Sequence, residues 1–196
     1  MRVLGCIIAG GISSRMGQEK ALMQLGGEPL ITHVAKRLAI QVEQLSVNAN
    51  GEAERFTFLN LPIFNDHIAT GGTPLAGLHA ALHFAKTSHF DAVLSVPSDT
   101  PFLPLDLRSR LETHATAVAS SRGQQHYLTG LWPASLLPEL ETAIAEQGIK
   151  RVWEWAVLVK AKPVEWSITD FDPFFNINTP EDLAQAETYL ALSEKL

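Results

Sequence analysis

The first twenty residues constrain this chain more than any other stretch. An apolar run over residues 2–9 is long enough for one buried strand, and Gly10 and Gly11 follow it at once. The polar segment after these glycines carries two cations, Arg15 and Lys20. Glycine lets the backbone approach a ligand closely and turns N–H groups toward anions. A buried strand that ends in such a loop predicts an anion-binding site, in the first place for phosphate groups.

This loop matches neither of the two common nucleotide-binding motifs. Lys20 is followed by Ala21, whereas a Walker A loop has Ser or Thr there. The pair Gly10 and Gly11 also lacks the G-x-G-x-x-G spacing of the dinucleotide fingerprint. Incidental charge on a surface loop is the alternative interpretation. The density of glycines and cations directly after a buried strand favours the phosphate site.

Composition restricts the partners that such a chain can have. The 196 residues are 46% hydrophobic, which suits a single domain over residues 1–196. The net charge is −6, so the chain has no bulk attraction for nucleic acid or an anionic membrane, and we expect neither as a partner. Phosphate binding must then be local, which again indicates Arg15 and Lys20.

Cysteine usage and the N-terminus predict a cytoplasmic protein. Cys6 is the only cysteine, so the chain has no internal disulfide and no zinc cluster of cysteines. The N-terminal segment has one Arg and a short apolar run that gives way directly to a polar loop, unlike a secretory signal. No segment approaches the roughly 18 apolar residues of a membrane span.

Strands and helices alternate through the first half of the chain. Strands are predicted over residues 2–9, 44–48, 62–64 and 91–96. Helices are predicted from Pro29, and from Thr73 and Pro74, which suit an N-cap and a first helical position. This alternation predicts an α/β fold in three layers: a doubly wound, mostly parallel, Rossmann-like sheet with helices on both faces.

The second half is less regular. Helices are predicted over residues 105–114, 136–147 and 150–159, and from Thr179, with Gly148 closing the second of them. Strands are predicted over residues 116–120, 126–132, 164–166 and 174–177. No internal repeat or linker divides the chain.

Two acidic residues are predicted to share the sheet edge on which the glycine-rich loop lies. Asp66 follows the third predicted strand, and Asp99 follows the fourth, between Pro97 and Pro101. In an open α/β sheet, ligands bind outside the carboxyl ends of the strands. A carboxylate at such an edge suits Mg²⁺, which prefers oxygen ligands. The alternative for each aspartate is a turn residue, which is common for Asp.

Two asparagines near the C-terminus form a further candidate pair. Asn176 and Asn178 have strand spacing, so both can face the same side of the chain. The alternative role is backbone capping ahead of the helix that begins near Thr179.

These motifs together resemble the molybdenum cofactor guanylyltransferases. The loop over residues 8–22 resembles the signature of that family, although many nucleotidyltransferases share it. Four further segments match in the same order, which makes the likeness much more specific: residues 48–50, 65–66 with 72–78, 97–102, and 176–183.

The resemblance implies a role for each matching residue. GTP is expected to be held by Ile8, Ala9, Gly10, Gly11, Lys20, Asn48, Asp66 and Asp99. Lys20, Arg15 and Asp99 are the implied catalytic residues, and Asp99 is also the implied Mg²⁺ ligand. Asn176 and Asn178 are expected near the pterin-bearing substrate or the metal. Gly11 indicates guanine, because the related cytidylyltransferases typically have Ala at this position.

The implied reaction transfers GMP from GTP to molybdopterin and releases pyrophosphate, with Mg²⁺ as cofactor. GTP and the molybdenum cofactor are the implied partners, with transient contacts to proteins of cofactor biosynthesis, and we expect a monomer. Two alternatives remain open. One is a nucleotidyltransferase of the sugar-phosphate or cytidylyl type with the same loop. The other is a non-catalytic GTP-binding module.

Overall fold

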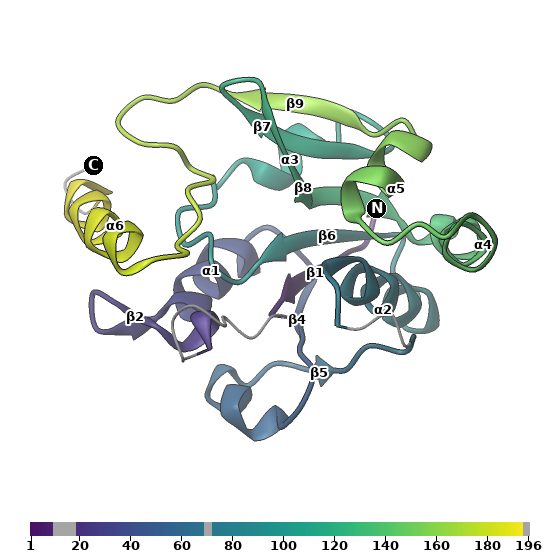
Figure 1. Ribbon diagram of the computed structural model, residues 1–196, viewed down its shortest axis with the longest axis horizontal. Helices are drawn as coiled ribbons and strands as arrows, with labels where there is room; N and C mark the ends of the chain where they lie inside the picture. Colours follow the sequence, from purple (N-terminus) through teal and green to yellow (C-terminus); the bar gives the residue numbers. More distant parts are fainter. Residues whose placement is uncertain (10–18, 69–71, 194–196) are drawn as a thin grey trace.

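A computed structural model describes residues 1–9, 19–68 and 72–193 (Figure 1). Its main sheet has seven strands in the order β5-β4-β1-β6-β8-β7-β9. Their bounds are β1 (Val3–Ile8), β4 (Gln44–Asn48), β5 (Ile63–Phe64), β6 (Ala92–Pro97), β7 (Ala117–Ser121), β8 (Gln124–Pro133) and β9 (Lys162–Trp166). Gly10, Gly11 and Arg15, which were predicted to belong to the site, lie outside the described residues.

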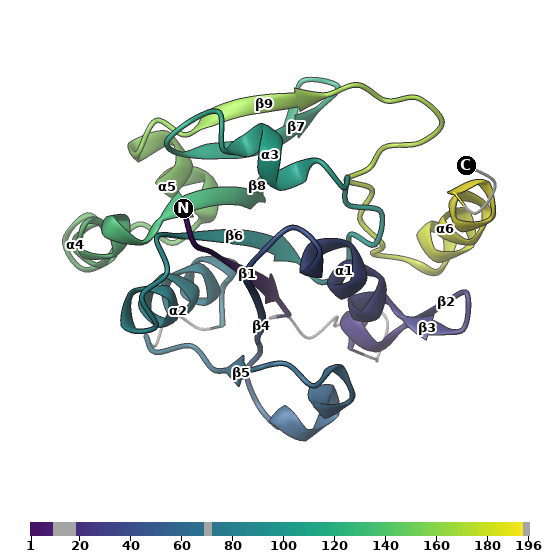
Figure 2. The same ribbon diagram turned by 180° about the vertical axis from the view of Figure 1, so that it is seen from behind.

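Helices cover both faces of this sheet, and the last helix lies apart from it, as Figures 1 and 2 show from opposite sides. Their bounds are α1 (Leu30–Ala39), α2 (Pro74–Thr87), α3 (Leu107–Leu111), α4 (Leu137–Gln147), α5 (Val152–Leu158) and α6 (Pro180–Ser193). The short 3₁₀ helices are η1 (Lys20–Leu22), η2 (Ala53–Leu59) and η3 (Ala134–Leu136), and β2 (Gln24–Leu25) forms a hairpin with β3 (Glu28–Pro29).

The central strand β1 is buried on both faces, which is why its sequence is a continuous apolar run. It pairs in parallel with β4 and with β6. Val3 and Ile7 pack on the side of α1 and α3, whereas Leu4 and Ile8 pack on the side of α2, α4 and α5. The predicted three-layer α/β fold with a mostly parallel sheet is therefore confirmed.

Strand β8 departs from the parallel pattern. It is antiparallel to both β6 and β7, and β9 then pairs in parallel with β7. Because of this topology, the first residues of β8 lie at the same edge of the sheet as the last residues of β1 and β6.

Local sequence signals explain where several helices begin and end. Thr73 caps α2 by accepting a hydrogen bond from the Ala76 N–H, and Pro74 is the first helical residue, as predicted. Gly148 closes α4 with a φ of 69°, a backbone conformation in which glycine is favoured. Both features lie in the sequence within a few residues of the helix end.

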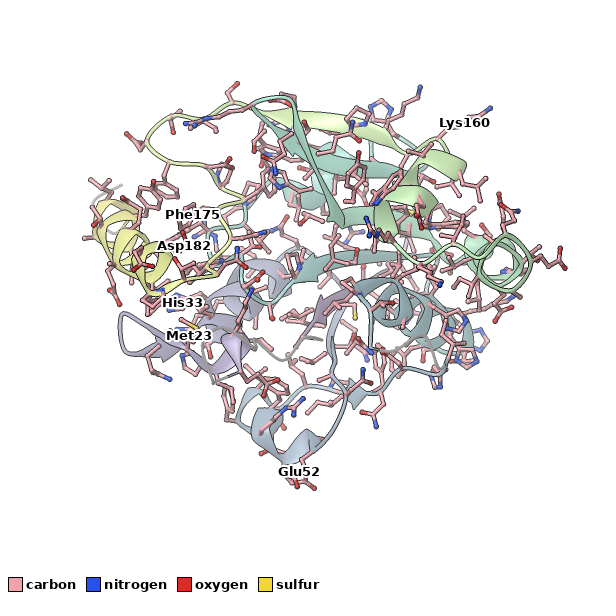
Figure 3. All side chains as sticks on the ribbon, viewed as in Figure 1. Met23, His33, Glu52, Lys160, Phe175 and Asp182 are labelled. Carbon is pink, nitrogen blue, oxygen red and sulfur yellow. The ribbon has the colours of Figure 1, made fainter. Side chains whose placement is uncertain are left out.

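Helix α6 lies beside the β2–β3 hairpin, away from the main sheet (Figure 1). Its start is fixed by a reciprocal cap: the Asp182 N–H donates to Thr179 Oγ1, and Asp182 Oδ2 accepts from the Thr179 N–H. Figure 3 labels Phe175 and Asp182 around this entry, and Phe175 packs with Met23 of the hairpin region in one apolar cluster. The cap and the cluster hold the segment that precedes α6.

Two predicted elements differ from the structure. Residues 174–177 are not a strand, because the Phe175 N–H donates to the Asp172 carbonyl and the Ile177 N–H to the Asp99 carbonyl, so neither bond is part of a strand ladder. The helix predicted over residues 105–114 is shortened to α3, which ends in turns. The 3₁₀ helix η2 had no predicted counterpart.

None of the helices in the described ranges is both long and apolar enough to cross a membrane.

Helix α2 approaches β1 and β4 closely at Gly77. A Cβ at this position would overlap the side-chain oxygen of Asn48 and lie 2.8 Å from Ile8 Cγ2. We expect Gly77→Ala to lower the free energy of unfolding by about 1–3 kcal/mol, the usual range for overpacking a core. Urea denaturation measures the change.

The exposed residue Glu146 on α4 supplies the control, because Glu146→Ala should change the stability by no more than about 0.5 kcal/mol. A Gly77→Ala protein as stable as the wild type would contradict the close approach.

Candidate active site

A cavity of about 690 Å³ opens at the carboxyl edge of β1 and β6. Its walls come from several parts of the chain that are distant in sequence. The described lining residues are Ile8, Ala9, Glu19, Lys20, Ala21, Pro74, Pro97, Ser98, Asp99, Thr100, Gln124, Gln125, His126, Tyr127, Leu128, Thr129, Phe174, Asn176 and Asn178. The structure thus brings together Ile8, Ala9, Lys20, Asp99 and both asparagines of the predicted site.

Lys20 is the charged centre of one end of this cavity. Its Nζ lies 3.6 Å from Asp99 Oδ2, and it donates a hydrogen bond to Asn178 Oδ1. The Lys20 side chain is 25% exposed and the Asp99 side chain 17% exposed, so both remain open to the cavity. An ammonium in this position can meet a phosphate group that enters the cavity.

The Asp99 carboxyl is shielded from water by its surroundings. Burial raises its pKa above the ordinary value, and the positive charge of Lys20 opposes this rise. The fold therefore holds the Asp99 carboxylate where burial makes its ionisation unfavourable. An ionisable group in a cleft whose pKa is shifted in this way is a candidate functional residue.

The segment before α6 closes the cavity beside Asp99. The Ile177 N–H donates to the Asp99 carbonyl at 3.0 Å, and the Ile177 side chain is fully buried. Asn176 Oδ1 accepts a hydrogen bond from Thr100 Oγ1 at 2.8 Å. Asn176 and Asn178 therefore flank a buried anchor, and both carboxamides reach the cavity even though the segment is not a strand.

Asn48 and Asp66 form a polar network at the ends of β4 and β5. Asn48 Nδ2 donates to Asp66 Oδ1 at 3.1 Å, and Asn50 Nδ2 donates to Asp66 Oδ2 at 2.7 Å. Asn48 is buried, and neither it nor Asp66 is among the described residues that line the cavity. In the described structure these two residues fix the strand ends; their contact with a nucleoside stays a prediction.

Glu19 adds a second acid to the lining. Burial raises the pKa of its carboxyl, and the charge of Arg55, whose Nε lies 3.0 Å from Glu19 Oε2, opposes this shift. Arg55 also donates to the Asn50 carbonyl. The ion pair offsets the negative charge of Glu19 next to Lys20.

The start of β8 contributes a wall of the cavity whose residues were not among the predicted site residues. Gln124, Gln125 and His126 line the cavity, and the Phe174 ring lies against the His126 ring with their centroids 4.7 Å apart. The signal was in the sequence as a tight turn at residues 121–124, which makes β8 antiparallel to its neighbour. A search confined to the ends of parallel strands could not find residues at the beginning of an antiparallel one.

The described residues hold no preassembled metal cluster. Across residues 1–9, 19–68 and 72–193, no group of three or more His, Cys, Asp or Glu side chains is placed to bind a metal ion. Asp99 is a single carboxylate. Mg²⁺ sites that work on phosphates are usually of this kind, because one or two carboxylates, the phosphates and water share the coordination.

Together, the sheet and the cavity define the class of protein. The architecture is that of the Rossmann-like nucleotidyltransferases, with the cavity at the carboxyl edge of the central strands. The model of the MobA-like NTP transferase domain matches residues 5–161.

Curated relatives identify the family within this class. A molybdenum cofactor guanylyltransferase of Rhodobacter capsulatus is 45% identical over 193 residues, which are 97% of each chain. Another protein of that name, from Cereibacter sphaeroides, is 43% identical over 97% of this chain and 98% of its own. The chain belongs to the molybdenum cofactor guanylyltransferase family, as the resemblance predicts.

Among solved structures, the fold is similar to molybdopterin-guanine dinucleotide biosynthesis protein A from Archaeoglobus fulgidus. The TM-score is 0.73 at 26% identity, over 96% of this chain and 99% of the other. The match therefore covers nearly the whole of both chains.

Asp99 provides a test that separates function from stability. We expect Asp99→Asn to raise the free energy of unfolding at pH 7, because the variant removes a buried charge whose desolvation outweighs its attraction to Lys20. This gain in the free energy of unfolding should be complete above the pKa that Asp99 has in the folded protein. It should vanish as the pH falls below 3.8, the ordinary pKa of the group, because Asp99 of the wild type is then protonated in both the folded and the unfolded state. Denaturant unfolding at pH 7 and at low pH measures it.

The exposed Asp170→Asn is the matched control and should leave stability unchanged at both pH values. A loss of stability in Asp99→Asn at pH 7 would show that Asp99 serves the fold rather than a ligand.

Proposed function

We propose that this protein transfers GMP from GTP to the terminal phosphate of molybdopterin, forming the guanine dinucleotide of the molybdenum cofactor and releasing pyrophosphate. One observation carries the proposal: a chain of this family places Lys20, Asp99 and Asn178 together in one cavity at the carboxyl edge of the sheet. GTP and the molybdenum cofactor are the substrates that the family implies.

The reaction makes one bond and breaks one. An oxygen of the acceptor phosphate attacks the α-phosphorus of GTP, and the bond between that phosphorus and the bridging oxygen of pyrophosphate breaks. The nucleophile is already an anion, so the transfer needs no covalent enzyme intermediate. The difficulty lies in bringing two polyanions together, and the protein's task is positioning and neutralisation of charge.

Lys20 is the described cation that is best placed for this task. Its contacts with Asp99 and Asn178 hold the ammonium at the cavity surface, where the phosphates of GTP can exchange places with these partners. Removal of one such contact costs on the order of 10²–10³ in rate, by analogy with donors that stabilise an oxyanion. Arg15 is proposed to assist Lys20.

Asp99 is the proposed ligand of Mg²⁺. The residues present fit this ion, because Asp99 is partly exposed in the cavity and Glu19, the other acid of the described lining, is paired with Arg55, which leaves the remaining positions on the ion to phosphate oxygens and water. When bound, Mg²⁺ neutralises phosphate charge. Asn176 and Asn178 are proposed to orient the acceptor beside it, since both carboxamides reach the same cavity from the two sides of Ile177.

The two alternatives lose support for different reasons. Curated relatives at 45% and 43% identity over nearly the whole chain are named for the guanylyl reaction, which does not favour a sugar-phosphate or cytidylyl enzyme. A non-catalytic GTP-binding module does not require the Asp99 carboxylate beside Lys20, at a position where burial raises the pKa of Asp99.

A nucleotide panel tests the proposal directly. The purified chain is incubated with molybdopterin, Mg²⁺ and each of GTP, CTP, ATP and UTP, and the products are identified by mass spectrometry. We expect the dinucleotide and pyrophosphate with GTP, and at least about 10²-fold less with Lys20→Met or without Mg²⁺.

Product with CTP and not with GTP would overturn the choice of base. Nucleotide binding without pyrophosphate release would overturn the transferase and support the binding module. Turnover of a sugar phosphate with none of molybdopterin would establish the other alternative.

A further inference from the structure

The wall that β8 contributes to the cavity contains a fixed histidine. His126 is bonded through Nε2 to Ser121 Oγ at 2.7 Å, and Ser121 Oγ donates to Asp172 Oδ2 at 2.8 Å. The other carboxylate oxygen of Asp172 accepts from the Phe174 N–H at 2.9 Å. The Phe174 ring in turn packs on the imidazole. Both the bonding and the orientation of His126 are therefore set by its neighbours.

This chain of hydrogen bonds determines which nitrogen of His126 carries the proton. The single hydroxyl proton of Ser121 is used on Asp172, so Ser121 Oγ can only accept from the imidazole, and Nε2 must be the N–H. Burial lowers the pKa of His126, against the negative charges of Asp172 and Glu165, which favours the neutral ring at pH 7. Nδ1 is then a hydrogen-bond acceptor.

The backbone at this point presents His126 to the cavity. The pairing of β7 with β8 shifts register between Val118 and Ala119: Ala119 pairs with His126, whereas Val118 pairs with Gly130. Residues 127–129 of β8 are therefore displaced from the regular ladder, and all three line the cavity. Such irregularities in a strand re-aim side chains and are common beside active sites.

A neutral Nδ1 selects the chemistry of its partner. Its lone pair accepts a hydrogen bond from an N–H group and does not attract a phosphate, which carries negative charge and no donor when it is fully ionised. Two parts of the substrates offer such an N–H edge: the guanine of GTP and the pterin of the acceptor. Ile8, Ala9 and Lys20, three of the residues expected to hold the nucleotide, line the cavity at and after the end of β1. His126 lies on the far side of β6, which leaves it for the acceptor.

We propose that His126 Nδ1 accepts a hydrogen bond from the pterin ring of the acceptor and so helps the enzyme to select it, with Ser121 and Asp172 as positioning residues. This inference rests on the proposed function. It assigns the β8 wall to the acceptor and leaves the phosphates to the Lys20 end of the cavity.

Two variants of one residue test the role of Nδ1. In His126→Asn the side-chain carboxamide occupies the place of Nδ1, so its oxygen can still accept the hydrogen bond. In His126→Gln the carboxamide occupies the place of Nε2, so the acceptor at the place of Nδ1 is lost. We expect His126→Gln to raise the KM for molybdopterin about 10- to 100-fold, the range for an N–H left without a partner, and His126→Asn to raise it less than about 5-fold. The kcat at saturating molybdopterin should change little in both.

The affinity for GTP, measured by calorimetry, should stay within about twofold of the wild type, because this contact is not made to the nucleotide. Ser121→Ala removes the hydrogen bond that orients the imidazole, so it should also raise the KM for molybdopterin. This variant serves as a second test if His126→Gln fails to fold. The exposed His114→Gln is the control and should leave every constant unchanged.

Three results would overturn the inference: an unchanged KM for molybdopterin in His126→Gln, equal losses in His126→Gln and His126→Asn, or a loss of GTP affinity, which would assign the contact to guanine. The proposed function is tested separately by the wild-type chain. If the wild-type chain forms no dinucleotide, both the proposed function and the inference are wrong. If the wild type forms the dinucleotide and His126→Gln has the same KM for molybdopterin, only the inference is wrong.

Discussion

The structure of the site depends on a carboxylate, Asp99, that the fold holds at the floor of the cavity against the cost of its burial. Lys20 offsets part of that cost from 3.6 Å, and the carbonyl of Asp99 fixes the segment before α6 through the Ile177 N–H. One residue therefore joins the loop after β1, the end of β6 and the entry of α6. A neutral residue would be cheaper at this position, so the charge is best explained by a ligand that needs it.

Two parts of the sheet face the cavity. The parallel strands β1 and β6 supply their carboxyl ends and, through η1, the cation Lys20, which suits phosphate. The antiparallel strand β8 returns from the other direction and supplies neutral polar and aromatic groups, His126 among them. A group transfer between two substrates requires two such surfaces facing a single reaction point.

The features that could be predicted from the sequence are those that local signals encode. The burial of β1 on both faces produces its continuous apolar run, Thr73 and Pro74 mark the start of α2, and Gly148 marks the end of α4. The positions of Lys20 and Asp99 followed from the rule that the ends of parallel strands share an edge. The motifs also identified the family, which the curated relatives confirm.

The features that could not be predicted depend on pairing across long distances in sequence. Residues 174–177 have strand-like composition, but their N–H groups bond to Asp172 and Asp99 instead of a neighbouring strand. The link from Ser121 and Asp172 to His126 spans 51 residues and exists only because β8 is antiparallel. The bond between Asn48 and Asp66, which fixes two strand ends, is of the same long-range kind, and the predicted contact of these residues with the nucleoside stays a prediction.

The central claim is that the cavity holds the nucleotide phosphates at its Lys20 end and the acceptor at its β8 wall. A crystal structure of the chain with Mg²⁺ and a GTP analogue that cannot be cleaved between the α- and β-phosphates tests it most directly. The account predicts phosphate oxygens within about 3 Å of Lys20 Nζ, the metal ion on Asp99, and the space beside His126 free of nucleotide. A triphosphate bound away from Lys20, or a guanine bonded to His126, would contradict it.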